Sequence, residues 1–110
     1  MKISRAAFSV TADGNGWICG SIFAPESCFA FDGEKITKKQ DMNFGHTDGA
    51  AMVYSVNKGL IIVGGREKIY YINNKGDRNP EADPKSPDSD IVEQFKDNRE
   101  WFDPFNALTN

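Results

Sequence analysis

Few side chains in this 110-residue sequence are of the types that perform chemistry. His46 is the only histidine, and Cys19 and Cys28 are the only cysteines. One histidine and two cysteines without a Cys-x-x-Cys pair make a poor zinc set, and no nucleophile elbow, zincin motif or phosphate-binding loop is present. A lone histidine at the start of a small-residue strand usually makes a structural hydrogen bond. We therefore expect no enzyme, no cofactor and no metal site.

The acidic residues also form no recognisable site. Asp13-Gly14-Asn15 begins like a calcium loop, but Trp17 stands at the next ligand position and no glutamate closes the loop. The Asp-Gly pair instead predicts a tight hairpin turn, because glycine adopts positive φ without steric cost. A formal net charge of −3 argues against nucleic acid as a partner, since such binding depends on lysine and arginine contacts to phosphates.

The two cysteines admit two readings. If the chain turns about residues 23–25, Cys19 and Cys28 fall opposite each other and a cross-strand disulfide is geometrically feasible. Residues 1–5 are not followed by an apolar block of signal-peptide length, which favours a cytoplasmic protein. Thiols stay reduced in that compartment, so we predict two buried, reduced cysteines. No apolar stretch approaches the roughly 20 residues of a membrane span, and we expect no membrane partner.

The elements that position these residues follow a plan that occurs twice. Residues 8–21 and 54–65 each read as strand, glycine-closed turn and strand, and each continues into a third apolar stretch, at 28–33 and 69–74. The offset is 46 residues from Phe8 to Tyr54 and 43 residues from Gly16 to Gly59. Repeats of roughly 40–50 residues with several strands are typical of propeller blades. We predict an all-β chain with blade-like repeats at 1–44 and 45–75.

The sequence changes character after the second repeat. Residues 76–89 are acidic and proline-rich without apolar periodicity, which predicts a linker. Asp90 and Glu93 stand in capping-box positions, and the apolar residues that follow share one helical face. We therefore predict a short amphipathic helix at about 90–102 within a C-terminal segment, 90–110, that ends in an aromatic tail.

The second repeat carries a family resemblance. Residues 45–53, then 59–65 with the double glycine Gly64-Gly65, then 69–72, resemble a kelch repeat. The first copy resembles it more loosely, with Gly20-Ser21 in place of the double glycine. The resemblance implies propeller blades in which these glycines allow close backbone approach and His46, which opens a strand, has a structural role.

Two blades do not close a propeller ring, which takes roughly four to eight. Three arrangements remain open on the sequence alone. The chain can assemble with copies of itself, for example as three two-blade subunits. It can be a split module completed by another chain. The two copies can also form a small β-sandwich whose open face the C-terminal helix covers.

The function that these patterns favour is binding. We expect a non-catalytic protein-interaction module, an adaptor or inhibitor, that forms a homo-oligomer and recognises a protein partner. Its predicted contact residues are the apolar ones of the C-terminal segment, namely Ile91, Phe95, Trp101, Phe102 and Phe105. The alternative is a carbohydrate-binding oligomeric propeller in which Trp17 or Trp101 provides a stacking platform.

Overall fold

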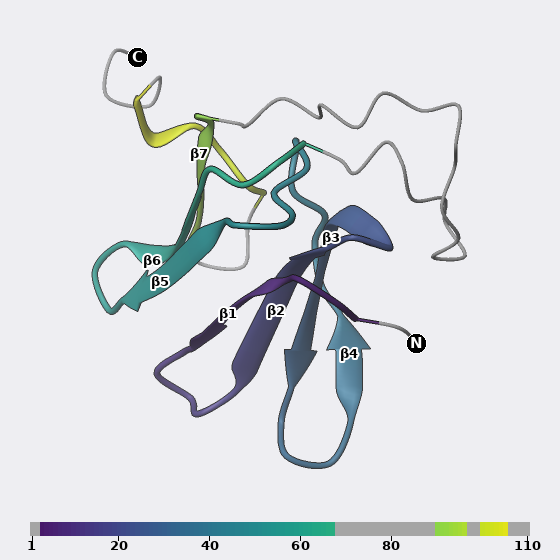
Figure 1. Cartoon of the computed structure of the whole chain (residues 1–110). Helices are drawn as coiled ribbons and strands as arrows, with labels where there is room; N and C mark the ends of the chain where they lie inside the picture. Colours follow the sequence, from purple (N-terminus) through teal and green to yellow (C-terminus); the bar gives the residue numbers. More distant parts are fainter. Residues whose placement is uncertain (1–2, 68–89, 97–99, 106–110) are drawn as a thin grey trace.

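The computed structural model describes residues 3–67, 90–96 and 100–105, which form two antiparallel sheets (Figure 1). The strand order is β1-β2-β3-β4 in the first sheet and β5-β6-β7 in the second. The first sheet is a meander, and in the second sheet the order of the strands likewise follows their order in the described chain. An all-β fold is thus confirmed for these residues. In this described part, no helix is long and apolar enough to cross a membrane.

The first sheet contains β1 (Ala7–Val10), β2 (Gly16–Ser21), β3 (Ala24–Phe31) and β4 (Ile36–Lys38). The predicted turn at Asp13 is confirmed: its carboxylate accepts the backbone N–H of Asn15 at 3.1 Å, and Gly14 has a φ of +85°. A second aspartate turn joins β3 to β4. There the carboxylate of Asp32 accepts backbone N–H groups of Lys35 and Glu34, and these hydrogen bonds lower the pKa of Asp32.

The second sheet contains β5 (Ala51–Ser55), β6 (Gly59–Val63) and β7 (Val92–Phe95). β7 lies where the sequence predicts a helix at 90–102, so that prediction is wrong for these residues. The strand pairs along its whole length with β6, from Leu60 opposite Phe95 to Val63 opposite Val92. Tertiary pairing with an apolar strand therefore outweighs the local helical pattern. The predicted β-sandwich covered by a C-terminal helix therefore has a strand, not a helix, at residues 92–95.

The sheet extends one residue further at its β7 edge. Phe102 forms a bridge with Gln94 through two backbone hydrogen bonds of 2.8 and 2.9 Å. The third apolar stretch of the second repeat, 69–74, and the predicted linker, 76–89, lie outside the described residues.

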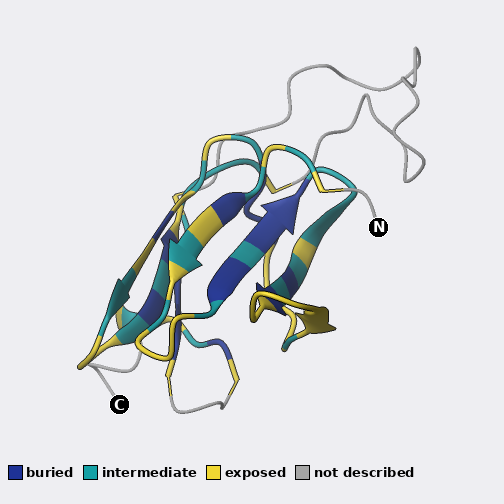
Figure 2. Cartoon of the chain, turned by 90° about the horizontal axis from the view of Figure 1, so that it is seen from below, coloured by how far each residue is buried: buried dark blue, intermediate teal, exposed yellow. Residues whose placement is uncertain are grey.

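The core lies between the two sheets, and its buried residues, dark blue in Figure 2, come from strands of both sheets. β1 of the first sheet runs close to β5 of the second. Side chains alternate along each strand, so every second residue points into this layer. The inward residues of the strands include Ala7, Trp17, Cys19, Cys28 and Ala30 from the first sheet and Met52, Leu60, Ile62 and Phe95 from the second.

A cross-strand disulfide joins Cys19 of β2 to Cys28 of β3. The two residues are direct register partners with Cα atoms 4.2 Å apart, a spacing typical of the narrow pairs in an antiparallel ladder. The expectation that they lie opposite each other is confirmed, whereas the prediction of two reduced thiols is wrong. The reduced state was inferred from an expected compartment, while the register alone brings the two sulfur atoms together.

Candidate functional site

His46 forms a buried hydrogen-bonded pair with Glu93. The histidine lies in the loop before β5 and the glutamate on β7, and both are essentially inaccessible to solvent. Nε2 of His46 lies 2.6 Å from Oε2 of Glu93, and Nδ1 lies 2.9 Å from the carbonyl oxygen of Gly64. The carboxylate also accepts the backbone N–H groups of Asn43, at 2.8 Å, and Phe44, at 3.2 Å.

The partners of the imidazole decide what this pair can do. A carbonyl oxygen only accepts, so Nδ1 of His46 donates to Gly64. The Glu93 carboxyl group accepts two backbone amides, so its contact with Nε2 completes a buried hydrogen-bonded cluster that joins the loop before β5 to β7. With both groups buried, no substrate contacts them in this conformation. The pair fastens the loop before β5 to the second sheet, as the structural reading of His46 requires.

The glycines assigned a structural role surround the same loop. Gly20 has a φ of +79°, and a Cβ atom there would lie 1.8 Å from the carbonyl oxygen of His46. Gly65 has a φ of +76°, and its Cβ would lie 2.7 Å from the carbonyl oxygen of Thr47. Gly64 also has positive φ and donates its amide to Ile91 at 3.1 Å. Side chains at Gly20 and Gly65 would therefore push the His46 loop away from both sheets.

Two of the predicted contact residues lie in the core. Phe95 packs between Trp17 and Trp101, with ring centroids 5.4 and 5.2 Å away. The Trp101 indole N–H donates to the carbonyl oxygen of Gln40 at 3.1 Å, and the ammonium of Lys39 lies 5.8 Å from the Trp17 ring. Both indoles are more than nine-tenths buried. Neither is available in this chain as a stacking platform for a sugar.

The other predicted contact residues are more accessible. Ile91 and Phe102 are half-buried at the edge of the second sheet, and Phe105 is 63% exposed. The structure thus brings Phe95, Trp101 and Phe102 together around β7 but does not present the five residues as one surface.

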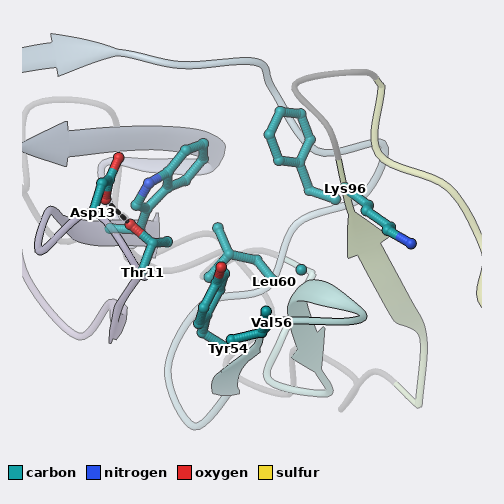
Figure 3. Close-up of a pocket in the computed structure, with 9 residues that line it drawn as sticks. Thr11, Asp13, Tyr54, Val56, Leu60 and Lys96 are labelled. Atoms are coloured by element: carbon teal, nitrogen blue, oxygen red, sulfur yellow. Dashed lines mark hydrogen bonds between the residues drawn. The ribbon is translucent and has the colours of Figure 1, made fainter.

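A small open cleft lies between the β1–β2 turn and the β5–β6 hairpin (Figure 3). Its volume of about 190 Å³ is below the roughly 300–1,000 Å³ of ordinary small-molecule sites. Thr11 donates its hydroxyl to the carboxylate of Asp13, and this hydrogen bond is the main cause that lowers the pKa of Asp13. In Figure 3 the ammonium of Lys96 points away from Asp13. The polar groups do not converge on one point, so the cleft does not indicate a small-molecule site.

The strongest candidate for a binding surface is the outward face of the first sheet. Strand register places Phe8, Ile18 and Phe29 in one cross-strand row, while the next row holds Val10, Gly16, Phe31 and Ile36. We call the six apolar side chains of these rows the aromatic face. Phe8 is 59% exposed and Phe31 is 42% exposed. Lys38 is the only charged residue in the two rows, and its ammonium lies 5.6 Å from the ring centroid of Phe29.

The outward side of the second sheet has the same character. The register aligns Ala51, Val63 and Val92 in one row and Val53, Ile61 and Gln94 in the next. We call the apolar members of these rows the valine face. Its Val53 is 58% exposed, and no charged side chain stands in either row. Sheets that face water normally carry polar residues on their outward side, and these two faces depart from that pattern.

Sequence reasoning did not name either face as a contact surface, although a signal was present. The segment Phe29-Ala30-Phe31 is apolar at consecutive positions, and so is Leu60 to Val63. Because neighbouring residues of a strand point to opposite sides, such runs indicate strands covered on both faces. The concentration of aromatics near the C-terminus drew the contact prediction there instead.

Neither a protein-family model nor a curated protein sequence matches this chain, so its candidate site is defined by the geometry of its two sheets.

Proposed function

We propose that this chain is a non-catalytic protein-interaction module, an adaptor or inhibitor, that recognises protein through the aromatic face. The observation that carries the proposal is the cross-strand arrangement of six apolar side chains on a sheet face with one charged residue in its rows. Flat apolar surfaces of this kind on a folded domain mark protein contacts, because water leaves them at a favourable free energy.

A kelch-like blade architecture is part of this proposal. In both sheets the order of the described strands follows the sequence, and β1 and β5, the first strand of each, run close together. Propeller blades are meander sheets that pack face to face around a central axis, so a blade inside a ring is apolar on both sides. The aromatic and valine faces support this reading, because each sheet here has one apolar face inside the chain and one outside.

The disulfide bears on where such a module acts. The sequence-based expectation is the cytoplasm, where disulfides are rare because thiols are kept reduced. A buried Cys19–Cys28 bond instead supports function in an oxidising compartment. Thiol titration of the protein isolated from its native host without reductant distinguishes the two, since a cytoplasmic chain yields two free thiols on denaturation.

The function is tested by protein capture with two matched lysine variants. Phe31→Lys places a charge in the aromatic face, and Val56→Lys places the same charge on a residue of the β5–β6 turn that is 79% exposed. A specific protein partner that wild-type chain and Val56→Lys retain, and that Phe31→Lys loses, supports the proposal. Equal capture of the same partners by all three chains contradicts it, provided that thermal melting shows all three to be folded.

A further inference from the structure

We propose that the aromatic face binds the valine face of a second copy of this chain, so that copies join head to tail into a closed ring. This inference rests on the proposed function and names the occupant of its contact surface.

The first argument is continuity of packing. Within one chain, the inward side of the first sheet packs against the inward side of the second, as the Trp17–Phe95 contact shows. The outward sides are apolar as well, with phenylalanines on the first sheet and mainly β-branched side chains on the second. A second copy stacked on the chain therefore extends an existing sheet-on-sheet arrangement by the same kind of contact.

The second argument is the complementarity of the two faces. The aromatic face presents large rings, of which the ring of Phe8 lies over the bare backbone of Gly16. The valine face presents short side chains, among them Ala51 and Val53, without a charge in its rows. Rings against short branched side chains interdigitate, whereas two valine faces would meet without projecting groups. The single charge, Lys38, does not face a like charge in the head-to-tail arrangement.

The third argument is area. At 59% and 42% exposure, Phe8 and Phe31 together leave roughly 150–250 Å² in water, because one phenylalanine buries roughly that much in full. With Val10 and Ile36, also about half-exposed, the patch reaches the few hundred Å² that mark contact sites on monomers.

The type of contact limits the possible assemblies. A contact between two different faces is heterologous, and it forms either a ring or an open fibre. Two sheets per chain and roughly four to eight blades per propeller give rings of two to four copies, with the trimer at the centre of that range.

Light scattering on the full chain at micromolar concentration tests the proposal. Wild type and Val56→Lys are expected to have a mass of two to four times 12.2 kDa. Phe31→Lys and Val53→Lys are expected to be monomers, because each places a charge in one of the two contact faces. Val53→Lys and Val56→Lys are matched, because both change an exposed valine of the same hairpin to lysine.

Mixing the two monomeric variants distinguishes loss of the contact from loss of folding. Phe31→Lys retains its valine face and Val53→Lys retains its aromatic face, so an equal mixture forms one intact contact and has the mass of a heterodimer. Absence of this heterodimer, with both variants folded by circular dichroism, overturns the head-to-tail contact.

Two other results also overturn the head-to-tail ring and leave the proposed function to be decided separately. If Phe31→Lys dissociates the oligomer and Val53→Lys does not, the aromatic faces pair with each other. If the wild type is a 12.2 kDa monomer throughout, another protein is the partner. In both cases the capture experiment with Phe31→Lys decides independently whether the aromatic face is the interaction surface.

Discussion

Removing the Glu93 carboxylate gives the sharpest test of how the chain is held together. Glu93→Ala deletes the acceptor of three hydrogen bonds, those from the imidazole of His46 and from the amides of Asn43 and Phe44. All three donors then face an apolar interior. Since β7 joins the sheet from a distant part of the sequence, loss of this anchor weakens both the loop before β5 and the seating of β7.

The magnitude follows from burial. Each buried hydrogen-bonding group left unpaired costs about 1–3 kcal/mol, and Glu93→Ala removes the partner of the Asn43 amide, the Phe44 amide and Nε2 of His46. Glu93→Gln costs less. Its amide can donate to Nε2 of a neutral His46 whose Nδ1–H still donates to Gly64, and its oxygen accepts one backbone amide. One buried N–H remains unpaired, which costs about 1–3 kcal/mol.

Urea unfolding at a fixed protein concentration measures these differences. The expected order of stability is wild type, Glu93→Gln, then Glu93→Ala. Glu34→Gln, an exposed glutamate in the β3–β4 turn, serves as the control and is expected to change stability by less than about 0.5 kcal/mol. If Glu93→Ala costs less than about 1 kcal/mol, or if the alanine and glutamine variants are equal, the buried pair does not anchor β7 as argued.

Three further outcomes are expected. Gly20→Ala is expected to lower the melting temperature far more than Gly33→Ala, because both glycines have positive φ but only Gly20 has backbone within contact of the added Cβ; equal melting temperatures would contradict the close approach to His46. Reducing the Cys19–Cys28 bond is expected to cost about 2–3 kcal/mol in urea unfolding, the loop-entropy value for a sequence separation of 9, and an unchanged midpoint would count against the bond. The chemical shift of the Asp32 carboxyl carbon, followed by NMR, is expected to give a pKa below the ordinary value of 3.8. Because the folded pKa is lower than the unfolded one, the stability that Asp32 contributes is present above the unfolded pKa and is lost as pH falls through the folded pKa. A midpoint at or above 3.8 would refute the turn hydrogen bonds.

The sequence predicts the local hairpins of this fold well. The Asp13-Gly14 turn, the strands on either side of it, and the opposition of Cys19 and Cys28 all follow from turn chemistry and alternation over short distances. β7 does not follow, because its partner strand β6 lies about thirty residues earlier and no local signal specifies that pairing. The capping-box glutamate of the predicted helix is instead the buried partner of His46. A lone histidine that is to be buried needs such an acceptor, and this requirement is the sequence-level clue to Glu93.

The outward faces depend on a finer feature, the register of each strand. Aligning the two hairpins by sequence matches Phe8 to Tyr54, but the ladders place Val10 opposite Gly16 and Ser55 opposite Gly59. Phe8 therefore corresponds to Val53, one position earlier than the sequence alignment suggests. A shift of one residue exchanges the two faces of a strand, so Tyr54 points inward while Phe8 and Val53 both point outward. With this register, the equivalent positions of both sheets carry exposed apolar side chains, which is the pattern expected of sheets stacked on both sides.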